Sequence, residues 1–256
     1  MLLEARGVTK RFGALAAVND LSFDVHTGET YGIAGPNGAG KTTLFDVISG
    51  HARATSGEIR FHGKTIQHMP AHRICHEGLA RTYQLTAVFG SQTVFGNALD
   101  AASYGRPGFR SPWSFHSADV SRAHAALQFV GLHDQLDRRA NVLSVYDRKR
   151  LMIATALATD PDLLMLDEPA GGLSDEECVS LIDLISKVKE LGVTVMVIEH
   201  VMHVLMSVSD RVLIMDSGAK LFEGTPAEVQ KDPEVIRIYL GSRKVEIAEG
   251  LGTDGA

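Results

Sequence analysis

The sequence predicts an α/β fold in which a parallel β-sheet carries polar, reactive side chains at the carboxyl ends of its strands. Three observations lead to this prediction. The apolar run Tyr31–Ala34 is typical of a buried strand, and a glycine-rich loop joins it to a helix expected over 41–49. A second apolar strand, over 162–167, ends in two carboxylates. A third, over 193–198, ends in a Glu-His pair.

Residues 35–42, Gly-Pro-Asn-Gly-Ala-Gly-Lys-Thr, have the pattern of a phosphate-binding loop. Backbone N–H groups of such a loop and the positive N-terminus of the next helix form a cradle for polyphosphate. Glycines let the backbone approach the anion, Lys41 reaches the β- and γ-phosphates, and Thr42 can ligate Mg²⁺. The alternative, a chance glycine turn, is disfavoured by the complete pattern between strand and helix. We therefore expect a nucleoside triphosphate to be bound by Gly35, Asn37, Gly38, Ala39, Gly40, Lys41, Thr42 and Thr43.

Asp167 and Glu168 form the acidic pair that ends the second strand. Ligands of a parallel α/β sheet bind at the carboxyl ends of its strands, so we expect both carboxylates beside the phosphate loop. One carboxylate suits the coordination shell of Mg²⁺, and the other can accept a proton from attacking water. An ordinary strand-end turn is the alternative, but the phosphate loop upstream favours a nucleotide site.

The N-terminal third is also predicted to contain a β-rich flank and a second helix. A helix following Pro70 is expected to lead toward Gln84. Its His72, Cys75 and His76 stand at one-turn spacing, yet a structural zinc site would need a fourth ligand, so a plain helix is the better interpretation. Strands of the flank are predicted for Leu2–Val8, Leu21–Val25 and Glu58–Phe61.

Several helices, a loop and a hairpin are predicted in the rest of the chain. Ser174 and Glu177 have the spacing of a capping box at the start of a helix over 174–190, whose Leu181, Leu184, Ile185 and Val188 share one face.

Residues 104–115 form an aromatic loop rich in glycine and proline, either a self-packed surface loop or a docking element. Other predicted elements are helices over 118–130 and 148–158 and a hairpin of 211–215 with 220–223.

Two longer segments carry a family resemblance. They read Gly-Leu-Ala-Arg-Thr-Tyr-Gln at 78–84 and Gly-Thr-Pro-Ala-Glu-Val-Gln-Lys-Asp-Pro-Glu-Val-Ile at 224–236, the latter followed by Tyr239-Leu-Gly241. Over nearly its whole length the chain resembles the ATP-binding subunits of ABC transporters, and it is most similar to the ATPases of branched-chain amino acid importers. The resemblance implies an α/β fold: a P-loop NTPase core (the ABC ATPase fold) with a β-rich flank and an inserted α-helical subdomain.

The resemblance also implies boundaries. Residues 1–84 would hold the phosphate loop and the antiparallel flank, and 85–150 the helical subdomain. Residues 151–243 would continue the core, through the acidic pair, His200, the hairpin and a C-terminal helix. Residues 244–256, which contain glycines and charges without periodicity, would be a flexible tail.

The resemblance assigns the adenine and coupling contacts. Phe12 stands where the family places an aromatic ring on adenine, with Val18 as a second apolar contact. Gln84 matches a glutamine that senses Mg²⁺ and the γ-phosphate and links the site to the membrane partner. The structural alternatives are a core position for Phe12 and a surface position for Gln84.

The resemblance also assigns the hydrolytic groups. Asp167 matches the aspartate of the Mg²⁺ shell, alongside Thr42 and Gln84, and Glu168 matches the general base. His200 matches a histidine that contacts the γ-phosphate and helps to hold the attacking water. A strand-end histidine with a purely structural role is the alternative for His200. With Lys41, these are the expected catalytic groups.

The signature loop, residues 143–147, departs from the family pattern. The family's usual Leu-Ser-Gly-Gly-Gln reads Leu-Ser-Val-Tyr-Asp here. Ser144 keeps a hydroxyl that, in the family, serves the ATP of a partner subunit. Tyr146 fills space where backbone N–H groups must approach the anion, and the Asp147 carboxylate is unfavourable near a polyphosphate. We therefore expect a head-to-tail heterodimer with a related ATPase, one of its two composite sites being weak.

Bulk properties fit a cytosolic enzyme subunit. The 256 residues suffice for one ATPase domain with an inserted subdomain, and a formal charge of −6 implies no general attraction to nucleic acid. Cys75 and Cys178 form no metal or redox motif, which fits a reducing compartment. The N-terminus lacks the pattern of a signal peptide, and no apolar run approaches the ~20 residues that span a bilayer. We expect a peripheral position at the cytoplasmic face of the plasma (inner) membrane.

The expected function is to bind and hydrolyse ATP with Mg²⁺ and so drive an ABC importer of branched-chain amino acids or a related small polar or aromatic solute. The expected partners are the second ATPase, integral membrane permease subunits and, indirectly, a solute-binding protein. Two alternatives remain open: the ATPase of a related lipid-export system, and a nucleotide-gated binding module with low turnover, which the altered signature loop suggests.

Overall fold

The computed structural model describes residues 1–83, 88–106 and 115–238, and within them a six-stranded sheet forms the centre, in the order β10-β9-β3-β8-β7-β6. All residues of the three middle strands β3, β8 and β7 are buried, which explains why their sequences are nearly continuous apolar runs. The parallel strands are β3 (Thr30–Ala34), β6 (Leu79–Arg81), β7 (Leu163–Asp167), β8 (Thr194–Ile198) and β9 (Arg211–Asp216), and β10 (Ala219–Gly224) pairs antiparallel with β9.

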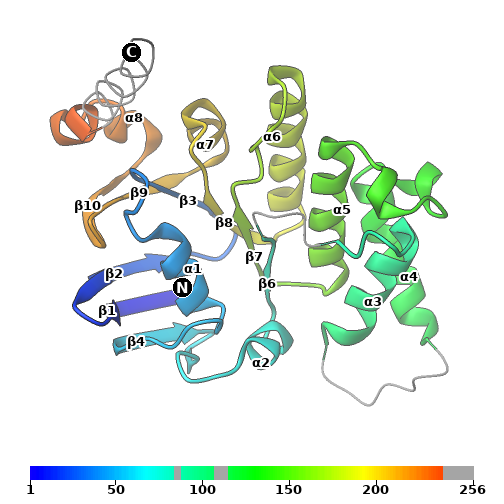
Figure 1. Cartoon of the computed structure of the whole chain (residues 1–256), viewed down its shortest axis with the longest axis horizontal. Coiled ribbons are helices and arrows are strands. Elements are labelled where there is room, and N and C mark those ends of the chain that lie inside the picture. Colours follow the sequence, from blue (N-terminus) through cyan, green and yellow to red (C-terminus); the bar gives the residue numbers. More distant parts are fainter. Residues whose placement is uncertain (84–87, 107–114, 239–256) are drawn as a thin grey trace, which may run out of the picture.

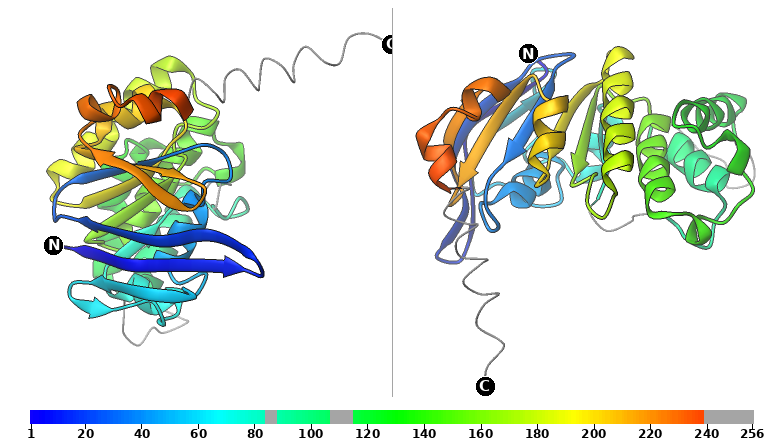
Figure 2. Two further views of the ribbon diagram at one scale, coloured as in Figure 1. Left: turned by 90° about the vertical axis from the view of Figure 1, so that its left-hand side faces the viewer. Right: turned by 90° about the horizontal axis from the view of Figure 1, so that it is seen from above.

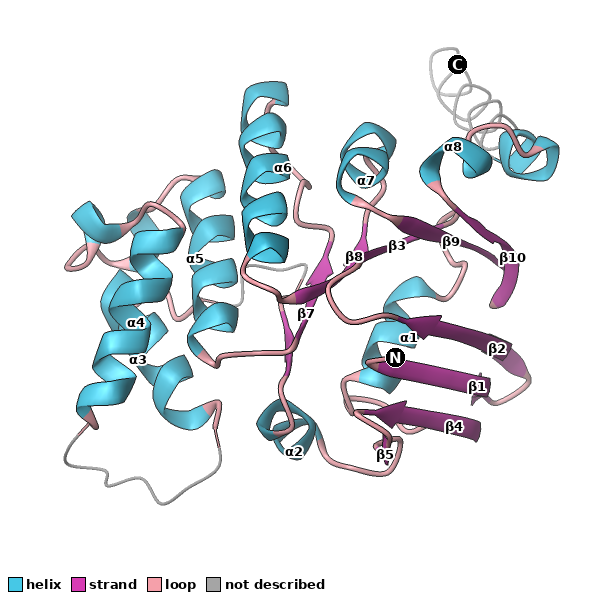
Figure 3. Cartoon of the chain, turned by 180° about the vertical axis from the view of Figure 1, so that it is seen from behind, coloured by secondary structure: helices cyan, strands magenta, loops and turns pink. Residues whose placement is uncertain are grey.

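The β-rich flank is a separate antiparallel sheet in the order β2-β1-β4-β5. Helix α1 (Lys41–Ile48) lies between this sheet and the central one (Figure 3). Its buried Leu44, Phe45 and Ile48 join one hydrophobic core with side chains from both sheets. The flank consists of β1 (Leu3–Phe12), β2 (Leu15–Val25), β4 (Ser56–Phe61) and β5 (Lys64–Thr65).

The opposite face of the central sheet is covered by α6 (Asp175–Glu190) and α7 (Met202–Val208), which contribute to a second hydrophobic core. The predicted capping box at the start of α6 is confirmed: Ser174 and Glu177 bond each other's backbone N–H groups. The predicted apolar face of this helix is buried, and the predicted hairpin is present as β9 and β10. The helices α2 (Ala71–His76) and α8 (Pro226–Val229) complete the core region.

The helices α3 (Val94–Tyr104), α4 (Ser117–Phe129) and α5 (Val145–Ala158) gather at one end of the molecule, opposite the β-rich flank (Figures 1 and 2). Two short 3₁₀ segments, His133–Gln135 and Ala140–Val142, lie in the same region. Helix α5 runs unbroken across the expected boundary at 150 and packs on both α3 and α4. The α/β fold with a β-rich flank and a helical insertion is therefore confirmed, while α3 and β6 are elements that the sequence patterns did not predict.

Candidate nucleotide-binding and hydrolysis site

The phosphate loop joins the end of β3 to the first residue of α1, as predicted, and it is packed against two other segments. A Cβ atom on Gly35 would lie 2.1 Å from the carbonyl oxygen of Met215, and one on Gly40 would lie 2.0 Å from that of Ala17. Both glycines also have positive φ. Glycine is therefore required at both positions because the loop packs closely against β2 and β9. This reason adds to the one given from the sequence, that glycines let the backbone approach the anion.

Lys41 begins α1 and turns its ammonium group back toward the loop that precedes it. Its Nζ donates hydrogen bonds to the carbonyl oxygens of Gly35 (2.8 Å) and Pro36 (3.0 Å), and the residue is only 5% exposed. Burial lowers the pKa of Lys41, and the nearby carboxylates of Glu168 and Asp167 oppose this effect. The acidic pair therefore lies close enough to the phosphate loop to interact with its lysine, as the strand order predicts.

Asp167 ends β7 and is 3% exposed. Its Oδ2 accepts a hydrogen bond of 3.0 Å from the guanidinium of Arg81, while its Oδ1 has no hydrogen-bond partner among the described residues. Burial raises the pKa of Asp167 in spite of the Arg81 charge. A buried carboxylate oxygen left without a donor, close to the phosphate loop, is the type of hard ligand that Mg²⁺ prefers. The Asp167 carboxylate therefore fits a magnesium ligand, while the predicted contact of Thr42 with the ion stays a prediction.

Glu168 and His200 are brought into direct contact from two neighbouring strands. The distance from His200 Nε2 to Glu168 Oε1 is 2.6 Å, with the two side chains 41% and 17% exposed. Glu168 follows β7 in the left-handed region, with a φ of 48°, a backbone conformation that costs energy for a residue with a side chain. Its N–H donates to the carbonyl oxygen of Ile198 at the end of β8, which fixes the loop beside His200. Such a pair can hold a water molecule and accept its proton.

Three charged residues near this pair were not assigned from the sequence. The side chain of Arg81 is 4% exposed and also bonds Asp46 and Ser49 of the α1 region. Lys149, on α5, donates from Nζ to the backbone oxygen of Glu168 at 3.0 Å. Glu199 is 2% exposed and accepts hydrogen bonds from backbone N–H groups. In the sequence, only their positions could have indicated Arg81 and Glu199. Arg81 stands three residues before Gln84, and Glu199 stands directly before His200.

The remaining predicted contacts are placed as follows. Phe12 is 55% exposed at the tip of the β1–β2 hairpin, so the core alternative for Phe12 is excluded, whereas Val18 is fully buried. Gln84 lies outside the described residues. Ser144 caps α5 in the helical subdomain, where its Oγ accepts the N–H of Asp147 at 3.0 Å. Ser144 thus belongs to the helical group and makes no hydrogen bond to the phosphate loop within the described part of the chain.

In the signature loop, the negative charge of Asp147 has partners that the sequence analysis did not foresee. Asp147 forms an ion pair with Arg150 and accepts a hydrogen bond of 3.3 Å from Gln135. Burial alone would raise the pKa of Asp147, but the hydrogen bonds from Arg150 and Gln135 outweigh it and hold the pKa below its usual value. The Tyr146 ring lies under the same guanidinium, 5.0 Å from ring centroid to Arg150 Cζ. The carboxylate that we expected to repel a polyphosphate is therefore compensated within its own helix.

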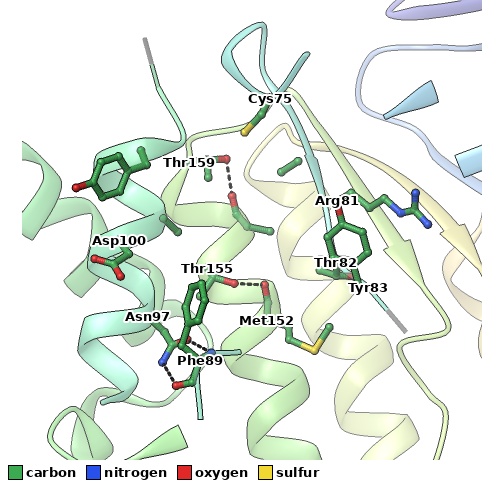
Figure 4. A pocket seen from close by; sticks show the side chains of 14 residues that line it. Cys75, Arg81, Thr82, Tyr83, Phe89, Asn97, Asp100, Met152, Thr155 and Thr159 are labelled. Carbon is green, nitrogen blue, oxygen red and sulfur yellow. Dashed lines mark hydrogen bonds between the residues drawn. The ribbon is translucent and has the colours of Figure 1, made fainter. Parts of the chain in front are cut away.

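A groove of about 440 Å³ separates the core from the helical subdomain (Figure 4). Strand β6 and the residues after it form one wall, with Arg81, Thr82 and Tyr83, and the helices α3 and α5 form the other. Tyr104, which opens the predicted aromatic loop, lines the groove, and residues 107–114 of that loop lie outside the described residues. The groove thus reaches from the helical subdomain to the arginine that contacts Asp167.

Within residues 1–83, 88–106 and 115–238, no group of three or more histidine, cysteine, aspartate or glutamate side chains is arranged to hold a metal ion. His72, Cys75 and His76 lie in helix α2, as predicted. Across the same ranges, every helix is too short or too polar to cross a bilayer.

The fold and the geometry define a phosphate-loop nucleotide-binding protein with a second, acidic element beside the loop. Comparison with family models refines this class. The model described as "ABC transporter" matches residues 18–171, and one described as "Branched-chain amino acid ATP-binding cassette transporter" matches residues 219–245. The chain belongs to the ABC transporter family.

Individual proteins agree with this placement. The chain is similar to the high-affinity branched-chain amino acid transport ATP-binding protein BraF of Pseudomonas aeruginosa, with 39% identity over 94% of this chain and 98% of that protein. It is 36% identical to the corresponding protein LivG of Escherichia coli K12, over 94% of this chain and 98% of LivG. A solved ATP-binding cassette of an ABC transporter in its ADP conformation superposes with a TM-score of 0.85 and 30% identity, covering 94% and 98% of the two chains. The resemblance stated from the sequence is confirmed.

Proposed function

We propose that this chain binds and hydrolyses ATP to drive an ABC importer of branched-chain amino acids or of a related small polar or aromatic solute. The observation that carries the proposal is the convergence of three groups at the carboxyl ends of adjacent strands. These are the phosphate loop after β3, the acidic pair after β7 and His200 after β8. The printed names of BraF and LivG support the choice of transported solute.

In the proposed reaction the phosphate loop holds the triphosphate through its backbone N–H groups and Lys41. Glu168 orients a water molecule and accepts its proton, and His200, 2.6 Å from that carboxylate, holds the same water against the γ-phosphate. Asp167 and Thr42 would hold Mg²⁺, with Gln84 as a further contact, and the ion would neutralise charge on the β- and γ-phosphates. Phe12 and Val18 would provide the apolar contacts to adenine.

The proposed assembly is a head-to-tail dimer on membrane permease subunits, at the cytoplasmic face of the membrane, supplied by a solute-binding protein. Ser144 would face the ATP of the partner ATPase. The groove beside Tyr83 and Tyr104 supports the docking of a permease segment, because it lies between the hydrolytic core and the helical subdomain.

Isolation of the native complex tests this function. We expect the chain to co-purify with a second ATPase and integral membrane permease subunits. We also expect ATP hydrolysis in membrane vesicles to rise when a branched-chain amino acid is added with its binding protein. Vesicles carrying Lys41→Ala serve as the control. A complex that hydrolyses ATP but transports lipid outward would contradict the importer and leave the ATPase intact.

The altered signature loop favours a second candidate, a nucleotide-gated module with low turnover. Restoring the family residues with Tyr146→Gly and Asp147→Gln should raise ATP hydrolysis by the complex about two- to tenfold, since backbone N–H groups could then approach the partner's ATP. Steady-state hydrolysis is measured beside Asp137→Asn, which changes an exposed acidic residue outside the signature loop. Unchanged turnover would mean that Val-Tyr-Asp already supports the reaction.

A further inference from the structure

Glu199 is a buried carboxylate that the proposed reaction does not use. It is 2% exposed and lies between the end of β8 and His200. Placing a carboxylate in the protein interior is unfavourable unless hydrogen bonds compensate the lost contact with water. Burial raises the pKa of Glu199 above its usual value, although the hydrogen bonds from its backbone partners oppose this effect. The geometry of its hydrogen bonds shows which segments this side chain holds.

The hydrogen bonds of Glu199 join two loops. We name residues 168–173 the base loop and residues 199–201 the switch loop. From the base loop, the N–H of Ala170 donates to Glu199 Oε1 at 2.5 Å. From the switch loop, the N–H groups of His200 and Val201 donate to Glu199 Oε2 at 3.0 Å and 3.1 Å. One side chain therefore fixes both loops, with one oxygen for each.

The two loops carry the residues that touch each other in the site. Glu168 opens the base loop, His200 lies in the switch loop, and their side chains meet at 2.6 Å. Lys149 adds a third attachment, from Nζ to the backbone oxygen of Glu168, and its charge lies near that of Glu199. Because Lys149 belongs to α5, the helix that starts at Ser144, the base loop is also tied to the helical subdomain.

A carboxylate suits this position better than an amide. It offers two oxygens and about four lone pairs, and it presents no N–H group to the three donors around it. Hydrogen bonds to an ionised acceptor are roughly twice as strong as neutral ones. A glutamine would keep the shape but would turn an NH₂ group toward either the Ala170 N–H or the switch-loop pair. One of the two loops would then lose its attachment.

We propose that Glu199 is a positioning residue for ATP hydrolysis, which holds the base loop and the switch loop in register so that Glu168 and His200 act on the same water molecule. The proposal rests on the proposed function of this site. In this proposal Glu199 does not contact the nucleotide, which is held by Lys41 and the phosphate loop between β3 and α1, whereas Glu199 follows β8. Its loss is therefore expected to change kcat and to leave nucleotide affinity unchanged.

The test compares Glu199→Gln and Glu199→Ala with the wild type in the assembled complex. We expect kcat to fall between about tenfold and a hundredfold, as for a small displacement of catalytic groups, with KM for ATP within about twofold. Affinity for the non-hydrolysable analogue AMP-PNP, measured on the same preparations, should also stay within about twofold. The glutamine variant keeps the volume of the side chain, so it remains informative if the alanine variant fails to fold.

Glu29→Gln is the matched control. Glu29 is another largely buried carboxylate that accepts a backbone N–H, that of His26, but it lies before β3, at the far end of the strand from the phosphate loop. The control should keep a normal kcat. An unchanged kcat in Glu199→Gln, or a parallel loss of kcat and AMP-PNP affinity, would overturn the positioning role. Glu168→Gln, assayed in parallel, separates this failure from a failure of the proposed reaction, because only the latter leaves that variant active.

Discussion

Glu168→Gln is expected to lower ATP hydrolysis by about two to four orders of magnitude while ATP binding is retained, as for the loss of a general base. Glutamine keeps the shape of the side chain and can still accept a hydrogen bond from His200, which lies 2.6 Å from the carboxylate in the wild type. It cannot take up the proton of the attacking water. ATP should therefore remain bound, and the two ATPase subunits should stay closed around it.

Single-turnover hydrolysis and gel filtration in the presence of Mg²⁺ and ATP measure this effect. Glu176→Gln is the control, because Glu176 is exposed in the first turn of α6, and its change removes the same charge from a nearby surface. Normal turnover in Glu168→Gln would remove Glu168 from the role of base and leave His200 to be tested by substitution. A variant that fails to bind ATP would instead point to a role in folding of the base loop.

Local patterns allowed much of the site to be predicted. The phosphate loop, the acidic pair and the α6 capping box each occupy a few consecutive residues, and the chemistry of such short motifs is independent of the rest of the chain. The strands β3, β7 and β8 were recognisable because burial on both faces demands continuous apolar runs. Their common orientation then brought the acidic pair to the phosphate loop.

Contacts between distant segments could not be predicted in this way. The Arg81–Asp167 ion pair depends on the pairing of β6 with β7, and β6 is only three residues long, too short to show a periodic pattern. The bond from Ala170 to Glu199 joins loops at the ends of two strands. For Asp147 the partner is close, since Arg150 is one turn further along α5, but the sequence alone did not show that the helix begins at Val145.

Gly40→Ala is expected to abolish measurable ATP binding and to lower the thermal stability of the nucleotide-free chain. The new Cβ would lie 2.0 Å from the backbone oxygen of Ala17, so either the phosphate loop or β2 must shift, and the φ of 95° adds strain. Because α1 starts directly after Gly40, any shift also displaces Lys41 from the cradle.

Gly38→Ala separates this packing effect from backbone strain alone. Gly38 also has a positive φ, of 81°, but a Cβ there would meet nothing within 4 Å. It should cost only the strain of about 1–3 kcal/mol, which for a chain of this size lowers Tm by several degrees. Differential scanning calorimetry without nucleotide compares the two variants, and isothermal titration with ATP and Mg²⁺ compares their binding. Equal losses of Tm would show that packing against β2 contributes nothing. A larger loss in Gly40→Ala means that the flank sheet holds the phosphate loop in the shape that binds the triphosphate.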